Sequence, residues 1–360
     1  MNTDFLVVGG GVVGLTTAQT LLQSGYRVTL VERGYLGEEA SWAGGGILSP
    51  LCPWDYQYSV TSLALLSMDM FSPAAAVLHS ATGIDPEYQR CGMLVLPPYE
   101  QTNAERWCQQ HKFPLNQVSP VEYLPHTNLD SEGFSDGLLL PTVAQVRNPR
   151  LMQALRAQVA LLGCKILERH EVLEFEISGE RVTGVQTNEG RLSADAFVVA
   201  AGAWSKNLLG EHAGAMDIRP IRGQILLYKF AAPPIRHIVL RGTLYIIPRL
   251  DGHVLVGSTL EDVGFDKSTT PEARERLLQQ VWEIFPDWRE HDPVRHWAGF
   301  RPGSPDNIPT IGQHPQLTNL FANSGHFRYG VTMSFASAAI LLNEIESRPQ
   351  PIAADAYSWR

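Results

Sequence analysis

The chain opens with short apolar runs that glycines separate. Residues 4–8, DFLVV, are rich in strand-favouring residues and lead into the cluster GGGVVG at residues 9–14. After it, apolar residues follow a helical spacing as far as Gly25, a residue type that commonly ends a helix. The run YRVTLVE, residues 26–32, has the composition of a second strand. The pattern therefore predicts a strand, a tight turn, a helix and a second strand.

Three glycines in this turn have the spacing of a dinucleotide fingerprint. Gly9 permits a tight turn, Gly11 lets the backbone approach a diphosphate, and Gly14 lets the helix pack on the strand. Free N–H groups at the helix N-terminus favour the negative charge of the diphosphate. Glu32 ends the second strand, where its carboxylate can accept from ribose hydroxyls and would repel a 2′-phosphate. The fingerprint predicts a dinucleotide site and leaves the choice between FAD and NAD open.

Four later segments favour a flavin. A second glycine triplet, residues 44–46, indicates another close approach of the backbone to a ligand. Residues 196–200 and 320–322 have the composition of further buried strands. Residues 330–344 are expected to form a helix whose N-terminus could face an anionic flavin ring.

Other parts of the chain indicate antiparallel structure. The runs TLYIIPR and HVLVGST flank the turn residues 250–252, and Asp-Gly between such runs is typical of a hairpin. A β-meander is expected over residues 178–199, with turns at Gly179 and Gly190. Thr270 followed by Pro271 has the pattern of a helix start.

Composition narrows the function classes. A net charge of -9 argues against a nucleic-acid surface, which needs clustered Lys and Arg. No pair among the four cysteines has CxxC spacing, and no combination of His, Cys and carboxylates completes a metal site. No transmembrane segment is expected from an uninterrupted apolar run, and the N-terminus lacks the basic start of a signal peptide, so a cytoplasmic location is the default.

Arg301 stands out in the segment WAGFRPGSPDNIPTIG, residues 297–312. No acidic residue lies within four positions of it, and a guanidinium is rarely buried without a partner. Two interpretations are open: an acidic side chain from another segment, or the carboxylate of a substrate.

With these segments the sequence resembles the D-amino-acid-oxidase-type flavoproteins. Within them it resembles the branch that oxidises glycine for thiamine biosynthesis. The resemblance runs from residue 4 to about 344. The segments that carry it are residues 4–32, ASWAGGGIL, FVVAAGAWS, the hairpin, residues 297–312 and GHFRYG.

The resemblance implies an α/β fold, with a Rossmann-like FAD-binding domain and a discontinuous α+β substrate domain built on an antiparallel sheet. The expected FAD-binding domain comprises residues 1–80, 141–215 and 296–360. The expected substrate-binding domain comprises residues 81–140 and 216–295.

The resemblance also implies FAD as the cofactor. Relatives with a covalent flavin attach it to a cysteine near the segment that matches residues 297–312, and none occurs there, so non-covalent FAD is expected. Beyond the glycines at positions 9, 11 and 14, the FAD contacts implied are Val12, Val13, Glu32, Arg33, Ala40, Ser41, Gly45, Gly46, Ile47, Val172, His326, Phe327, Arg328, Tyr329, Gly330, Val331 and Thr332.

The implied reaction is oxidation of glycine, sarcosine or small D-amino acids to the imine, with O2 reduced to hydrogen peroxide. The implied substrate-binding residues are Tyr245, Arg301 and Arg328, and Ile47 and Leu260 fall at pocket positions where methionines are expected. A homo-oligomer, dimer or tetramer, is also implied. A D-amino-acid dehydrogenase that reduces a quinone, a non-catalytic FAD-binding protein and a pyridine-nucleotide dehydrogenase remain alternatives.

Overall fold

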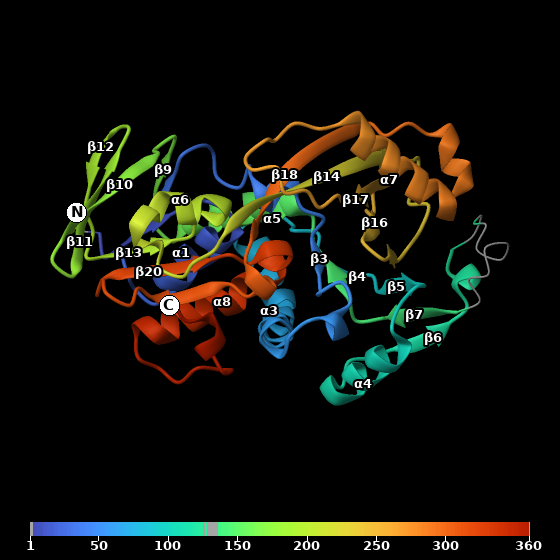
Figure 1. The fold of residues 1–360 in the computed structure, drawn as a ribbon, viewed down its shortest axis with the longest axis horizontal. Coiled ribbons are helices and arrows are strands. Elements are labelled where there is room, and N and C mark those ends of the chain that lie inside the picture. The colour runs from blue at the N-terminus through green and yellow to red at the C-terminus, as the bar shows by residue number, and fades with distance from the viewer. Residues whose placement is uncertain (1–2, 125–126, 128–135, 360) are drawn as a thin grey trace.

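Two large sheets lie side by side in the fold (Figure 1). The computed structural model describes residues 3–124, 127 and 136–359. The expected domain ends at residues 1 and 360, and part of the expected segment 81–140, therefore lie outside the described residues.

The first sheet is mainly parallel. Its strand order is β19-β20-β13-β1-β2-β9, with every neighbouring pair parallel except β19 and β20. All four residues of β1 are buried, because one face of the sheet packs on the helix at residues 12–23 and the other packs on a small sheet that contains Val172 and Phe175. The strands are β1 (Phe5–Val8), β2 (Val28–Glu32), β9 (Lys165–Glu168), β13 (Ala196–Val199), β19 (Thr310–Gln313) and β20 (Leu320–Ser324).

The predicted strand-helix-strand unit at the N-terminus is confirmed. Helix α1 (Val12–Gln23) ends at Gly25, whose φ of +90° suits the left-handed conformation that glycine adopts readily. Tyr26 N donates to Leu21 O at 3.1 Å and Gly25 N donates to Leu22 O at 3.0 Å, the two bonds of a Schellman motif. This turn directs the chain from α1 back into the sheet.

The second large sheet is antiparallel apart from one parallel contact, between β15 and β5. Its order is β18-β14-β17-β16-β15-β5-β7-β6. The strands are β5 (Met93–Leu96), β6 (Asn116–Val118), β7 (Gly137–Leu140), β14 (Arg219–Lys229), β15 (Ile238–Arg241), β16 (Leu244–Pro248), β17 (His253–Gly257) and β18 (Arg295–Gly303).

The predicted hairpin is the pair β16 and β17. Tyr245 lies opposite Gly257, and Gly252 takes a φ of +84° in the turn. Asp251 Oδ1 accepts from His253 N at 3.1 Å, as an aspartate in a turn commonly does.

Strand β18 extends the antiparallel sheet beyond this hairpin. It pairs with β14 from Arg219 opposite Gly303 to Leu227 opposite Arg295. The segment that follows crosses back to β19 of the parallel sheet. The expected domain boundaries stay a prediction.

Two small sheets complete the strands. The meander consists of β10 (Val172–Ser178), β11 (Arg181–Thr187) and β12 (Gly190–Leu192). It begins before the expected range of residues 178–199, and residues 196–199 of that range form β13 of the parallel sheet instead. The other small sheet, in the order β3-β8-β4, contains β3 (Ile47–Leu48), β4 (Gln89–Arg90) and β8 (Ala144–Gln145).

The long helices pack in two places. Helices α1, α3, α5 and α8 contact one another beside the parallel sheet, and α7 covers β14 and β17. The expected start of α7 is confirmed, since Thr270 Oγ1 accepts from Ala273 N. The remaining bounds are α2 (Ala40–Ala43), α3 (Tyr58–Thr82), α4 (Gln101–His111), α5 (Asn148–Leu161), α6 (Ser205–Leu209), α7 (Pro271–Ile284) and α8 (Gly330–Ile345).

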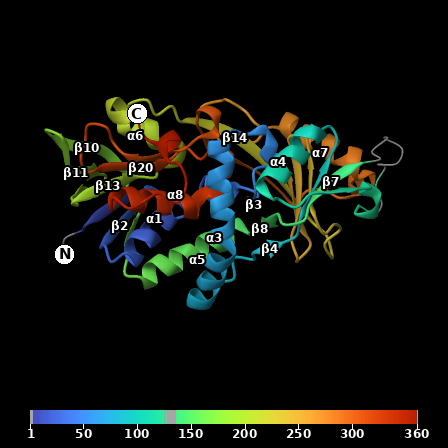
Figure 2. The same ribbon diagram turned by 90° about the horizontal axis from the view of Figure 1, so that it is seen from below.

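Helix α3 is long and apolar enough to cross a membrane, judged by length and composition only. In the fold it lies between the half with the parallel sheet and the half with the antiparallel sheet (Figure 2). It packs on α8 and α5, and Phe71 meets Phe335 edge-on at 5.0 Å between ring centroids. Such packing is also typical of a core helix in a globular protein.

Candidate active site

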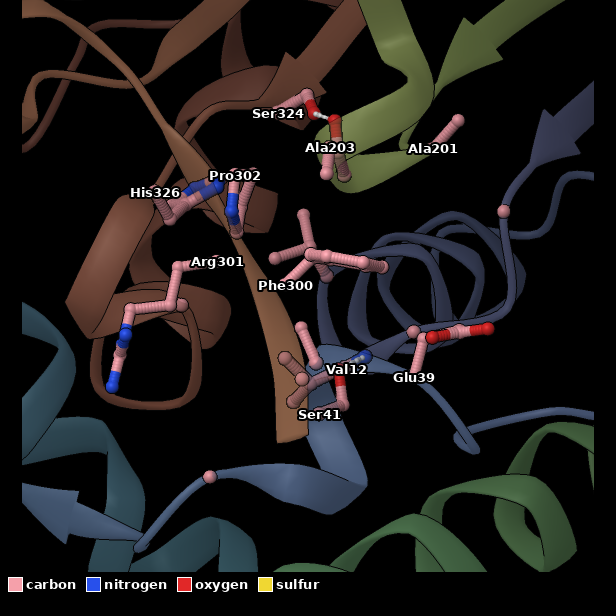
Figure 3. A pocket seen from close by; sticks show the side chains of 18 of the residues that line it. Val12, Glu39, Ser41, Ala201, Ala203, Phe300, Arg301, Pro302, Ser324 and His326 are labelled. Atoms are coloured by element: carbon pink, nitrogen blue, oxygen red, sulfur yellow. Dashed lines mark hydrogen bonds between the residues drawn. The ribbon is translucent and has the colours of Figure 1, made fainter. Parts of the chain in front are cut away.

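A cavity of about 430 Å³ lies where the two large sheets meet. The turn between β1 and α1 and the residues after β20 line it from the parallel sheet. Strands β14, β16 and β18 line it from the antiparallel sheet. Figure 3 shows Val12 and Ser41 at one part of the cavity and Arg301 and His326 at another.

Nearly all the residues expected at the site line this cavity. Gly14 and Thr332 do not, and each supports a residue that does: Gly14 packs against Gly9, and Thr332 Oγ1 donates to Ile47 O at 3.0 Å. The expected residues that line the cavity are Gly9, Gly11, Val12, Val13, Glu32, Arg33, Ala40, Ser41, Gly45, Gly46, Ile47, Val172, Tyr245, Arg301, His326, Phe327, Arg328, Tyr329, Gly330 and Val331.

The three fingerprint glycines differ in what surrounds them. A Cβ at Gly14 would stand 1.8 Å from Gly9 O, and one at Gly9 would stand 2.4 Å from Ala200 O. These two glycines are therefore required by the fold itself. A Cβ at Gly11 would meet only Ser41 Oγ, at 3.1 Å. Because the protein leaves space in front of Gly11, its lack of a side chain fits a ligand that passes close to the backbone.

Glu32 is held at the end of β2 by two backbone amides. Gly10 N donates to one carboxylate oxygen at 2.8 Å and Gly34 N donates to the other at 2.9 Å. A carboxylate offers about four acceptor sites, so these two bonds leave capacity for ribose hydroxyls. Helix α1 carries no acidic residue in its first turn, which suits a diphosphate at its N-terminus. The residues present therefore fit a dinucleotide.

A buried arginine that sequence reasoning missed fixes the second glycine cluster. Arg249 follows β16, and its Nη2 donates to Gly45 O at 2.8 Å while its Nη1 donates to Val146 O at 2.8 Å. Burial lowers the pKa of Arg249 to about 10. A Cβ at Gly46 would stand 2.2 Å from Val146 O, so this loop has no room for side chains. Only the position of Arg249 just before the hairpin turn hinted at this contact.

Arg301 extends from β18 along the neighbouring strands. Its Nη1 donates to Thr259 O at 3.1 Å and its Nη2 donates to Ser258 Oγ. Burial lowers the pKa of the Arg301 guanidinium, and the Tyr245 phenol next to it opposes that change. Among the described residues, no carboxylate forms an ion pair with Arg301, so an acidic partner from another segment is not found there.

Tyr245 and Arg328 lie in the same part of the cavity. Tyr245 stands on β16 and is buried, and the charge of Arg328 acts on Arg301 across the cavity. Tyr329 donates to Tyr56 Oη, and burial together with this contact raises the pKa of Tyr329 well above its usual value. Tyr329 is therefore neutral, and the neighbouring cation that acts on Arg301 is Arg328.

His326 is fully buried beside the cavity and carries no charge at neutral pH. Burial lowers its pKa to about 3, and its Nε2 atom has no hydrogen-bond partner. The ring therefore adds no charge to this side of the cavity, and its unpartnered Nε2 is shielded from solvent.

Several cavity residues gave no signal in the sequence. Trp204 lines the cavity beside the expected residue Arg33, whose guanidinium carbon lies 3.7 Å from the centre of the Trp204 ring. Gly223, on β14, and Ser258, directly after β17, also line it, and no local pattern places either residue at the cavity. Leu260, expected at a pocket position, is 51% exposed and lies outside the lining residues.

Comparison with known proteins decides the family. The model of the family "FAD dependent oxidoreductase" matches residues 4–343. The chain belongs to this family. A protein of Pseudomonas aeruginosa named glycine oxidase is 44% identical over 98% of this chain and 97% of its own length. A glycine oxidase of Pseudomonas putida is 40% identical over 98% of this chain and 96% of its own length.

A solved structure of a similar protein has the same fold. The glycine oxidase from Geobacillus kaustophilus superimposes with a TM-score of 0.93 at 25% identity, covering 100% of this chain and 98% of that one. The expected fold, an α/β fold with a Rossmann-like part and an antiparallel sheet, is thereby confirmed, as is the expected family. FAD is the cofactor that the family implies.

The glycine fingerprint yields a paired prediction. Gly11→Val should give folded protein that lacks FAD, because its side chain would fill the ligand space and touch little else. Gly14→Ala should instead lower the free energy of unfolding by about 1–3 kcal/mol or more, the usual cost of overpacking. Thermal unfolding and flavin absorbance per chain distinguish the two variants. Full flavin content in Gly11→Val would contradict the site assignment.

Proposed function

We propose that this chain oxidises glycine and other small amines or D-amino acids, such as sarcosine and D-alanine, to imines that hydrolyse to 2-oxo acids. Molecular oxygen is reduced to hydrogen peroxide. The broader class, an FAD-dependent amino-acid oxidase, follows from the family and from relatives named glycine oxidase. The observation that carries the narrower proposal is Arg301, a partly buried cation in the cavity wall without a carboxylate partner among the described residues.

In this proposal Arg301 binds the carboxylate of the substrate. A guanidinium has five N–H donors, and the contacts to Ser258 and Thr259 use two of them. The others suit a carboxylate bound by two charge-assisted hydrogen bonds. Tyr245 beside Arg301 provides a phenol donor to the same carboxylate, and Arg328 provides a second positive charge.

The shared cavity favours a small substrate. FAD must occupy the length from the glycine turn to the glycine loop 44–46, so the space left beside Arg301 is limited. Ile47 and Leu51 give this cavity an apolar lining. We therefore expect a glycine-sized substrate to fit better than a bulky D-amino acid.

In this proposal the side chains at the site act mainly by positioning the substrate. FAD, when bound, accepts the hydride from the substrate Cα, and the amine loses a proton as the C=N bond forms. Arg301 and Tyr245 hold the carboxylate and thereby orient the Cα–H bond, a contribution of proximity and orientation. His326 stays neutral and adds no charge near the reacting atoms.

The comparisons also support a role in thiamine synthesis. A protein of a Nostoc species named bifunctional protein ThiO/ThiG is 30% identical over an alignment that covers 98% of this chain and 54% of that protein. We propose that the imine formed here supplies the thiazole part of thiamine. A cytoplasmic location and a homo-oligomeric state, dimer or tetramer, belong to the same proposal.

Oxygen uptake by the purified enzyme tests the proposed reaction. With glycine, and without any added quinone, uptake should be accompanied by an equal amount of hydrogen peroxide. The kcat/KM for glycine, sarcosine or D-alanine should exceed that for a bulky D-amino acid.

Each opposite result identifies an alternative. Turnover only with a quinone would indicate a dehydrogenase, like the 28% identical D-amino acid dehydrogenase of Methylobacterium radiotolerans. A flavin that no amino acid bleaches under anaerobic conditions would indicate a non-catalytic FAD-binding protein.

Acid precipitation tests how the flavin is held. No cysteine occurs among the described residues that line the cavity, and none occurs in residues 297–312. The yellow flavin should therefore pass into the supernatant when the protein is precipitated with acid. Colour that stays in the pellet would show covalent attachment.

Substitution of Arg301 tests the carboxylate contact. Arg301→Ala should still bind FAD, and its kcat/KM for glycine should fall on the order of 10²-fold or more, because charge-assisted hydrogen bonds are lost. Arg301→Lys keeps the charge and loses the planar pair of donors, so it should recover only part of the activity. An unchanged kcat/KM in Arg301→Ala would mean that Arg301 does not bind the substrate.

A further inference from the structure

The guanidinium of Arg301 lies directly over the backbone of a neighbouring strand, at Gly223. In the pairing of β14 with β18, Ile221 is opposite Arg301 and Gly223 is opposite Gly299. The Arg301 side chain therefore crosses diagonally over position 223 on its way to Ser258 and Thr259. A Cβ at Gly223 would stand 2.2, 2.3 and 2.4 Å from the Nη1, Nη2 and Cζ atoms of Arg301.

The backbone at this position does not itself require glycine. Gly223 is not among the residues with a positive φ, and it lies within a regular strand, so any L-residue could adopt its conformation. The three nearest atoms that a Cβ would meet all belong to the Arg301 guanidinium. The missing side chain at position 223 therefore serves the placement of that group.

The guanidinium cannot easily move aside. Its two hydrogen bonds go to Ser258 and to the backbone of Thr259, and Thr259 is fixed in turn because its Oγ1 accepts from Gln224 N at 2.9 Å. A Cβ at position 223 would force the guanidinium off these acceptors and change where its remaining donors point. The position of the Arg301 guanidinium in the cavity wall thus depends on the absence of a side chain at position 223.

We infer that Gly223 is a positioning residue for substrate recognition: its lack of a side chain sets where the Arg301 guanidinium lies and thereby the affinity for a substrate carboxylate. This inference rests on the carboxylate-binding role proposed for Arg301. Gly223 itself donates nothing to the substrate in this account, and it acts only through Arg301.

The test compares Gly223→Ala with a matched glycine on the partner strand. Gly303 also lies in a strand without a positive φ, and a Cβ there would meet Ile221 Cγ1 at 2.6 Å and Arg219 O at 3.3 Å rather than Arg301. Gly223→Ala should keep its FAD and lose on the order of 10²-fold in kcat/KM for glycine, mainly through a higher KM. Gly303→Ala should stay within about threefold of the parent enzyme, as mutations that touch no special contact do.

A double-mutant cycle shows whether the effect passes through Arg301. When Arg301 is already alanine, Gly223→Ala should change neither kcat/KM nor the dissociation constant of acetate, measured by flavin absorbance. If the fold-losses in kcat/KM of the two substitutions multiply instead, Gly223 acts independently of Arg301 and the inference is wrong. An unchanged kcat/KM in the single variant Gly223→Ala would also overturn it.

Two further results separate the possible failures. If Gly223→Ala does not fold, the double variant with Arg301→Ala should fold and bind FAD, because the clash is gone; a double variant that also fails to fold would contradict the inference. If Arg301→Ala alone leaves glycine oxidation unchanged, the proposed function has failed. If Arg301→Ala is severely impaired and Gly223→Ala is not, only the present inference has failed.

Discussion

The structure of the candidate site depends on one partly buried positive charge. Arg301 is partly buried in the wall of the cavity, and its hydrogen-bond partners among the described residues are hydroxyl groups and a carbonyl oxygen, all neutral. Removing an ion from water costs several kcal/mol unless an opposite charge offsets it. A substrate carboxylate is the partner that offsets this cost within the proposed function, and the fold contributes a cavity in which the two can meet.

The arrangement of the two sheets explains why the charge lies beside the proposed FAD site. The parallel sheet contributes the glycine turn and Glu32, and the antiparallel sheet contributes Tyr245 and Arg301. The two meet at the loop 44–46, which Arg249 ties to the hairpin through backbone carbonyl oxygens. Because Arg249 binds neutral oxygens there and no carboxylate among the described residues, the loop is held in place without a negative charge that would compete with the substrate for Arg301.

The sequence predicted those parts of the molecule whose signal is local. Three such parts each depend on a glycine in a strained or crowded position: the turn at Gly9 and Gly14, the end of α1 at Gly25, and the hairpin turn at Gly252. A glycine of this kind can be recognised from the residues next to it in the sequence. The contact between Gly223 and Arg301 depends instead on the register between β14 and β18, which are far apart in the chain. No local pattern specifies a register, so Gly223, Ser258 and Arg249 were missed, and Leu260 was expected in a cavity that it does not line.

The most direct test of this account is to compare how the oxidised, FAD-loaded protein binds acetate and acetamide. The two ligands have nearly the same shape, and only acetate carries a charge, so their difference in affinity reports an interaction with a cation. Titration followed by flavin absorbance should show acetate binding at least about tenfold more tightly, as expected for charge-assisted hydrogen bonds. This preference should disappear in Arg301→Ala. Equal affinity for the two ligands, or a preference for acetate that persists without Arg301, would contradict the central claim.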